Sequence, residues 1–155
     1  MFSPANASQK WIFRELKSRL LKRVYLGLKT GFDPLLAFLN KPATSAQASD
    51  LVARLKSVGL NLGLIVLIGA GGDQFADPHI EDALIRKMPL GTEDMIYLSP
   101  LHVAPDSQYA YRAREAGIRA LSSLEIEEQT ERMRASLIKQ PGPRLARYDI
   151  REFVY

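Results

Sequence analysis

Hydrophobic side chains in the first part of the chain follow the spacing of a helix and then of a buried strand. Ile12, Leu16 and Leu20 recur every four residues, which places them on one face of a helix over residues 8–22. Residues 23–28 are apolar and partly β-branched or aromatic, a pattern typical of a buried strand ahead of a glycine turn. The pattern therefore predicts a helix followed by a strand.

Two further helices are expected after this strand. Asp33 can cap the first of them, and Pro34 suits a first helical position because it has no N–H to leave unpaired. Thr44 or Ser45 can cap the second helix, and Gly59 follows that helix as a C′ residue.

The clearest strand covers residues 60–68, a nearly continuous apolar run. Such a run is expected where helices cover both faces of a parallel sheet. A glycine-rich loop over residues 69–73 and a helix over about residues 75–88 follow it. The rest of the pattern predicts a strand, two helices and a terminal segment of mixed polarity, over residues 95–98, 106–116, 124–138 and 148–155.

Strands that alternate with helices require parallel pairing through crossover connections, so the predicted fold class is α/β. The length of the chain fits a single domain over residues 1–155, without internal repeats. About three principal strands are few for a free-standing α/β domain. We therefore expect a partial parallel (β/α) barrel of about three strands with C-terminal helices, or part of a larger sheet.

The sequence contains no cysteine and two histidines, His79 and His102. The absence of cysteine excludes disulfides, thiolate zinc sites, a cysteine nucleophile and any cysteine-ligated cluster on this chain. Two imidazoles fall short of the three or four ligands of a typical zinc site, so no metal-ligating residues are expected.

No stretch of the sequence has the length of a membrane span. The longest apolar run, residues 60–70, is shorter than the roughly 20 residues that a bilayer requires. Residues 1–6 have neither the basic flank nor the apolar stretch of a signal peptide. We therefore expect a cytoplasmic protein without a membrane partner.

The formal net charge is +4, and basic residues cluster near both ends of the chain. Acidic residues, among them Asp149 and Glu152, interrupt the C-terminal cluster. A nucleic-acid groove requires basic residues interleaved with exposed aromatic rings on one face. The pattern instead favours solvated helix faces, so a nucleic-acid partner is not expected.

Candidate chemistry lies after the strands, because parallel α/β folds place their sites at the C-terminal ends of strands. Gly69, Gly71 and Gly72 form a strand-to-helix loop whose amides could approach a ligand, or which simply turns tightly. Lys29 could bind an anion, or extend to solvent. His102 has no assignable partner carboxylate, so no catalytic residue is predicted.

Four segments resemble the radical S-adenosylmethionine (SAM) enzymes, in the branch with tRNA-modifying and coproporphyrinogen-oxidising members. Residues 24–42, including Gly27-Leu28-Lys29-Thr30-Gly31 and Leu39-Asn40-Lys41-Pro42, resemble the fourth-strand segment of that family. Residues 64–73 resemble the fifth strand with its loop, and residues 95–101 are similar to the sixth strand. Residues 146–155 resemble the tail of one uncharacterised subgroup.

The resemblance implies the C-terminal part of a (β/α)₆ barrel. In the family, a three-cysteine loop after the first strand binds a [4Fe–4S] cluster, which chelates and cleaves SAM. By position, Lys29 stands where a glutamate or glutamine bonds the SAM ribose, and Lys41 where a basic residue meets the SAM carboxylate. Gly69, Gly71 and Gly72 stand in the loop along the adenine.

The first three strands and the cysteine loop have no counterpart in the sequence given. The resemblance therefore implies a truncated iron–sulfur family member, inactive alone, whose partner is a chain that supplies the N-terminal half-barrel. Lys29 departs from the family pattern, because lysine cannot accept a hydrogen bond and repels the SAM sulfonium. Two alternatives remain open, namely a non-catalytic partner-binding half-barrel and a stand-alone α/β module that binds an anion.

Overall fold

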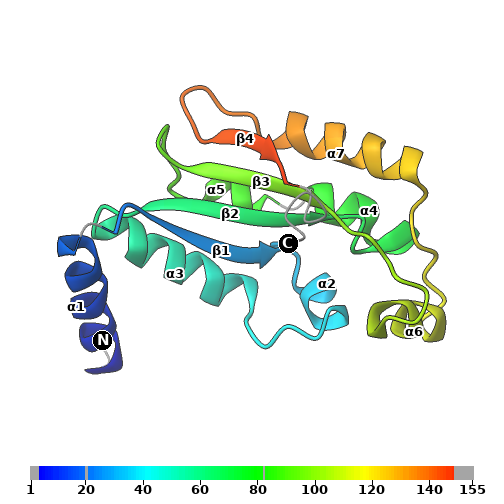
Figure 1. Cartoon of the computed structure of the whole chain (residues 1–155), viewed down its shortest axis with the longest axis horizontal. Coiled ribbons are helices and arrows are strands. Elements are labelled where there is room, and N and C mark those ends of the chain that lie inside the picture. The colour runs from blue at the N-terminus through cyan, green and yellow to red at the C-terminus, as the bar shows by residue number, and fades with distance from the viewer. Residues whose placement is uncertain (1–3, 20, 82, 149–155) are drawn as a thin grey trace.

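The computed structural model describes residues 4–19, 21–81 and 83–148. Its centre is one parallel sheet of four strands in the order β1-β2-β3-β4 (Figure 1). The strands are β1 (Arg23–Lys29), β2 (Asn61–Ile68), β3 (Met95–Pro100) and β4 (Arg144–Arg147). The α/β class and the partial-barrel arrangement predicted from the sequence are confirmed.

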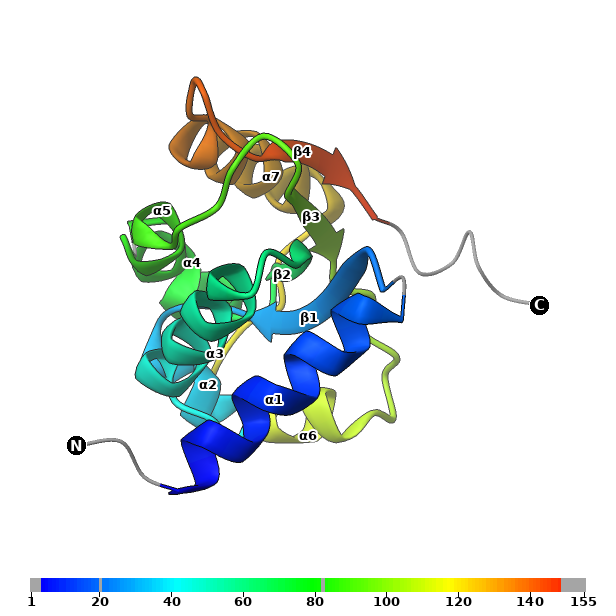
Figure 2. The same cartoon turned by 90° about the vertical axis from the view of Figure 1, so that its left-hand side faces the viewer.

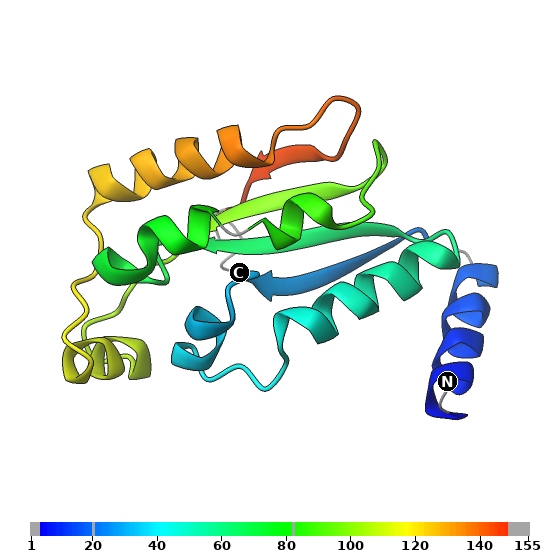
Figure 3. The same cartoon turned by 180° about the vertical axis from the view of Figure 1, so that it is seen from behind.

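Helices surround this sheet on one face and at both ends. The described helices are α1 (Pro4–Ser18), α2 (Asp33–Phe38), α3 (Ser45–Ser57), α4 (Gly72–Glu81), α5 (Leu84–Lys87), α6 (Gln108–Glu115) and α7 (Ser123–Leu137). Helices α3, α4, α5 and α7 lie on the same face of the sheet (Figure 3). Helices α2 and α6 lie beyond the C-terminal ends of the strands, and α1 lies at the opposite end (Figure 1). No helix in the described ranges is long and apolar enough to cross a bilayer.

The core lies between the sheet and the helices on that face. Leu62, Leu64, Val66 and Ile68 of β2 all point toward the helices and have no solvent exposure. Helices on both faces were expected from the apolar run, and that expectation is wrong for the described residues. The sheet curves, and the covering helices lie on the outer side of the curve (Figure 2). The alternate residues of β2 therefore line an open inner face.

A fourth strand was missed by the sequence analysis. β4 pairs parallel with β3, with Leu145 opposite Ile96, and the Tyr148 N–H donates to the Leu98 carbonyl at 2.9 Å. Its sequence, Arg-Leu-Ala-Arg, is short and half charged, so it lacks the apolar run of a buried strand. Tertiary pairing with β3 decides its conformation. Residues 149–155 of the expected terminal segment lie outside the described residues.

Helix ends test the capping predictions. Thr44 caps α3, accepts from the Gln47 N–H and completes a capping box. Gly59 follows α3 with a φ of +77°, as expected for a C′ glycine. The prediction for Asp33 is wrong, because Phe32 is the N-cap residue of α2. The Asp33 carboxylate instead accepts hydrogen bonds from the backbone and side chain of Ser45, at 2.7 and 3.0 Å.

Two other helix boundaries differ from the expectation. The first helix begins at Pro4 and ends at Ser18, four residues earlier than predicted at each end, and Leu20 of its expected face lies outside the described residues. The helix expected over residues 75–88 is two helices, α4 and α5.

A buried carboxylate, Asp94, fixes the start of the sheet. Its side chain is fully buried and accepts hydrogen bonds from the N–H groups of Leu62 and Gly91, both at 2.7 Å. The Lys56 ammonium of α3 lies 2.8 Å from the same carboxylate. Asp94 therefore ties the loop before β3 to β2 and to the end of α3.

We predict that Asp94→Ala lowers the free energy of unfolding by about 3–5 kcal/mol, because it leaves Lys56 and the Leu62 amide without their buried partner. Urea unfolding followed by circular dichroism measures the loss. The control is Asp50→Ala, which removes the ion pair of a mostly exposed carboxylate with Arg54 and is expected to cost less than about 1 kcal/mol. Equal losses in the two variants would contradict the assignment.

Candidate functional site

The C-terminal ends of β1, β2 and β3 lead into three loops that lie together. Aromatic rings join them, with the Phe32 and Phe75 centroids 6.3 Å apart and those of Phe38 and Phe75 6.0 Å apart. Tyr109 of α6 lies edge-on to Phe38 at 5.9 Å and donates its hydroxyl to the Ala70 carbonyl at 2.8 Å. The structure thus brings the candidate residues after β1 and β2 into one region.

Lys29 ends β1 in a left-handed conformation, with a φ of +70°. A non-glycine residue rarely adopts this region, so the surrounding contacts hold it there. Its side chain folds back along the strand, since a Cβ built on Gly27 would lie 3.3 Å from the Lys29 Nζ. The backbone therefore turns the ammonium toward the sheet instead of away into solvent.

Lys29 and Lys41 interact as like charges. Burial lowers the pKa of the Lys29 ammonium, and the positive charge of Lys41 lowers it further. No described carboxylate forms an ion pair with either lysine. The charge of Lys41 thus acts on Lys29, the other residue that the family resemblance places at SAM. Neither ammonium group is paired with a carboxylate of the described residues.

The loop after β2 contains the three candidate glycines, and all three are buried. A Cβ on Gly71 would lie 2.4 Å from the Phe75 Cβ, and one on Gly72 would lie 2.5 Å from the Arg119 carbonyl oxygen. Gly69 and Gly72 also have positive φ, +82° and +53°. Close packing and backbone conformation therefore explain all three glycines without a ligand.

Most of the polar groups of this loop already have partners within the chain. The Gly69 N–H donates to the Gln129 side chain of α7, and the Gly72 N–H donates to the Gly69 carbonyl at 3.1 Å. Asp73 lies inside the first turn of α4 and not at its cap. Its N–H and carboxylate bond reciprocally with the backbone of Arg119, both at 3.0 Å.

A buried threonine–histidine pair joins β1 to α4. His79 is 2 % exposed, its Nε2 lies 2.7 Å from the Leu67 carbonyl, and its Nδ1 lies 2.7 Å from the Thr30 hydroxyl. A carbonyl only accepts, so Nε2 carries the proton and Nδ1 accepts from Thr30. Both ring nitrogens are engaged in holding strands to a helix, which is a structural role.

Sequence reasoning missed the partners that hold these loops, namely Thr30, His79 and Gln129. Their types are common in many environments, and nothing in their local spacing marks them as neighbours. The distances along the chain explain why, because 49 residues separate Thr30 from His79 and 60 separate Gly69 from Gln129. Only the tertiary structure brings them together.

The end of β3 does not assemble a catalytic set within the described ranges. Ser99 is buried in the strand, opposite Leu67 of β2, and His102 is exposed in the loop beyond. No group of three or more histidine, aspartate or glutamate side chains among the described residues is placed to hold a metal ion.

The residues present do not fit the cofactors of the radical SAM family. The sequence offers no thiolate for a [4Fe–4S] cluster. By the family resemblance, Lys41 would face the SAM carboxylate, but the Lys29 ammonium would stand at the ribose, where it repels the nearby sulfonium. Lysine also supplies no acceptor for the ribose hydroxyls. We therefore derive no chemical step through either group.

A groove of about 680 Å³ runs along the outer side of β1. Its walls are mostly apolar and come from α1, β1, the residues before α3, and α3 itself. Leu26, Leu28, Leu51 and Val52 are among its lining residues, and Lys41 lies at the same groove. The groove therefore follows the strand that ends the sheet.

Neither a scan of the sequence against protein-family models nor a search of curated proteins finds a match.

Two glycines test whether packing explains the loop. Gly72→Ala meets a positive φ and the Arg119 carbonyl, whereas Gly117→Ala meets a positive φ with nothing within 4 Å. Each substitution costs about 1–2 kcal/mol through its conformation, and we predict a clearly larger loss of unfolding free energy for Gly72→Ala. Chemical denaturation measures both. Equal losses would show that the loop has room for a side chain.

Proposed function

We propose that this chain is the C-terminal half of a barrel of the radical SAM type, which binds the strands of the other half along β1. Its own residues supply fold and docking surface and no radical chemistry. The observation that carries the proposal is the unpaired edge of β1 beside an apolar groove. The resemblance of residues 24–42 to the family's fourth strand supports the position of the missing strands.

The edge of the sheet provides the first support. Among the described strands, β1 pairs only with β2, so its other side presents backbone N–H and C=O groups without a strand partner. Natural proteins normally shield such an edge with a bulge, a charged side chain or a covering element. An edge strand in a parallel sheet with an adjacent groove is suited to accept a further strand.

The apolar surface beside this edge provides the second support. The groove is lined mostly by apolar side chains, among them Phe13 of α1 and Leu51 of α3. On α1, Trp11, Ile12 and Leu16 are also exposed, by 66, 44 and 41 %. An exposed apolar surface of this kind marks an interaction site. A strand that pairs with β1, followed by its helix, would cover the groove.

We predict that the isolated chain self-associates with increasing concentration, because it has no partner for this edge. Size-exclusion chromatography with light scattering measures the association. Leu26→Lys places a charge in the groove and is expected to reduce it. Leu124→Lys changes an apolar residue of α7 that is 70 % exposed and serves as the control. A wild-type protein that stays monomeric at all concentrations contradicts the proposal.

The family assignment has a separate readout. The DNA that flanks this coding sequence should encode three βα units with a Cys-x-x-x-Cys-x-x-Cys loop, which is the family's cluster motif. Co-expression of that segment should yield a complex with this chain that contains iron and sulfide. If no such segment exists, the radical SAM assignment fails, and a self-associating half-barrel remains.

A second candidate function is the binding of an anion at Lys29 and Lys41. Burial lowers the pKa of Lys29 and the charge of Lys41 lowers it further, and this repulsion between the two ammonium groups is the observation in its favour. An anion between them would relieve that repulsion and restore the charged form of Lys29. Inorganic phosphate is the simplest probe of this chemistry.

The depressed pKa of Lys29 gives this candidate a pH test. Between the folded pKa and the ordinary value of 10.5, the unfolded chain binds more protons, so Lys29 contributes a stability that rises with pH. The affinity for phosphate changes in the opposite direction. It falls as the pH rises through the pKa of Lys29 in the folded chain, because Lys29 then loses its positive charge. NMR titration of the Lys29 Nζ should show a higher pKa in Lys41→Met and an unchanged pKa in Lys87→Met. An unchanged pKa in Lys41→Met contradicts the pairing.

A further inference from the structure

The inner face of the sheet, opposite the helices, combines aromatic rings with unpaired cations. None of the four strands contains an aspartate or glutamate. Tyr25 of β1 is 58 % exposed on this face, and Tyr97 of β3 is half-buried. The functions considered above use the edge of β1 and the C-terminal loops, and leave this face unassigned.

The tyrosines form a row across the sheet. The ring centroids of Tyr25 and Tyr97 are 5.9 Å apart, and those of Tyr97 and Tyr148 are 6.2 Å apart. Gly63 of β2 makes the row continuous, because a Cβ there would lie 2.6 Å from Tyr25 and 3.1 Å from Tyr97. The aromatic surface therefore extends from the first strand to the end of the fourth.

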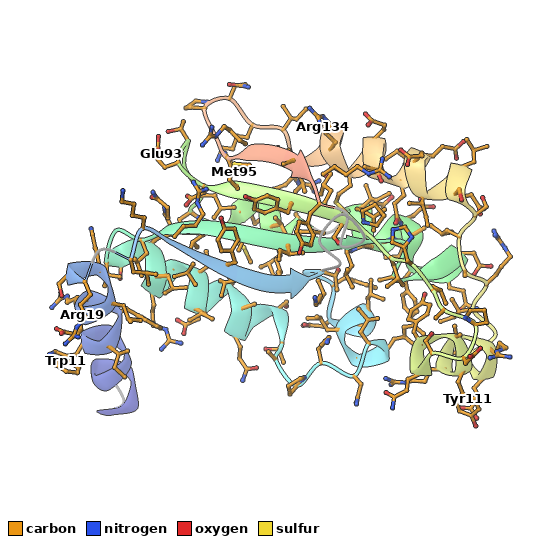
Figure 4. The ribbon with its side chains drawn as sticks, in the orientation of Figure 1. Trp11, Arg19, Glu93, Met95, Tyr111 and Arg134 are labelled. Atoms are coloured by element: carbon orange, nitrogen blue, oxygen red, sulfur yellow. The ribbon has the colours of Figure 1, made fainter. Side chains whose placement is uncertain are left out.

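Two arginines from opposite edges of the sheet lie near the start of β3. The Arg23 guanidinium of β1 reaches across and donates to the Glu93 carbonyl at 2.7 Å. The backbone N–H of Arg144 in β4 donates to the carbonyl of the next residue, Asp94, at 3.1 Å, and Arg144 pairs with Met95 of β3. The guanidinium of Arg23 and the backbone of Arg144 therefore both lie at the turn that begins β3, where Glu93 and Met95 lie (Figure 4).

Neither guanidinium is neutralised by the described residues. Arg23 and Arg144 form no ion pair there, and the Arg23 Nε is buried without a hydrogen-bond partner. The carboxylate of Glu93 is exposed and bonds to neither arginine. A buried donor without a partner carries an unfavourable free energy that a ligand can relieve.

The pKa of the Tyr97 phenol depends on burial and on these neighbouring groups. Burial raises its pKa, the hydrogen bond and charge of Tyr25 raise it further, and Arg23 and Arg144 act in the opposite direction. The phenol is therefore a neutral donor at physiological pH. The opposing effect of both arginines on this pKa agrees with their places near the start of β3.

We infer that the inner face of the sheet binds a nucleotide, with its phosphate between Arg23 and Arg144 and its base on the Tyr25 ring. Guanidinium groups bind phosphate through paired N–H donors, and exposed tyrosine rings stack on bases. The site uses only residues of this chain. It does not depend on closure of a barrel, nor on Lys29 and Lys41.

Calorimetry with four probes at low salt separates the parts of this proposal. AMP should bind most tightly, because it alone offers both phosphate and base. Ribose 5-phosphate and inorganic phosphate should bind more weakly, and adenosine weakest. Equal binding of inorganic phosphate and AMP would overturn the nucleotide class, and the absence of AMP binding at millimolar concentration would overturn the site.

Matched variants locate the binding. Arg144→Gln should weaken AMP binding about tenfold, as should Arg23→Gln, through the loss of charge-assisted hydrogen bonds. Tyr25→Ala should weaken AMP about five- to tenfold while leaving phosphate binding unchanged. Arg144 is exposed and its side chain holds no described hydrogen bond, so its variant is expected to fold normally, as circular dichroism can verify.

The controls are an exposed arginine of α7 and an exposed tyrosine of α6, Arg134 and Tyr111 (Figure 4). Arg134→Gln and Tyr111→Ala should both bind AMP like the wild type. A loss in Arg134→Gln as large as that in Arg144→Gln would show unspecific attraction to a basic protein and overturn the site. A loss only in Lys29→Met would move the ligand to the C-terminal loops.

Discussion

The pairing of β2 with a strand on each side is the constraint on which the rest of this structure depends. β2 is bonded to β1 and β3 along nearly its whole length, and its helix-facing side chains are completely buried. A strand with both edges paired and one face sealed has a single register available, because a slip by one residue would turn its buried side chains outward. Asp94 reinforces that register from the end where the strands begin, through its bond to the Leu62 amide.

The covered face and the open face of this sheet have different consequences for function. On the covered face, Thr30 and His79 bond to each other and Gln129 bonds to the Gly69 N–H, and these buried polar groups tie strands and loops to helices. These bonds account for the shape of the loops after β1 and β2. On the open face and along the edge of β1, hydrogen-bond groups, rings and cations remain available. The surfaces suited to partners and ligands are therefore those that the helices leave uncovered.

Charge distinguishes the two ends of the open side. Lys29 and Lys41 repel each other near the C-terminal end of β1, and Arg23 and Arg144 both lie near the start of β3. No carboxylate of the four strands compensates either pair. The strands thus present a basic inner side, although the formal charge of the whole chain is only +4. The distribution of charge, and not its sum, favours anionic ligands over the sulfonium of SAM.

The sequence by itself determined the α/β class, the three long strands, a helix cap at Thr44 or Ser45, and the C′ role of Gly59. These features depend on local periodicity, local capping geometry and the conformational freedom of glycine. It also marked Lys29 and the loop from Gly69 to Gly72 as residues after strands. Only the tertiary structure decided that β4 is a strand, that helices cover one face, and that Arg23 and Arg144 both lie near the start of β3. These outcomes depend on contacts between segments far apart in the chain, which leave no trace in local spacing.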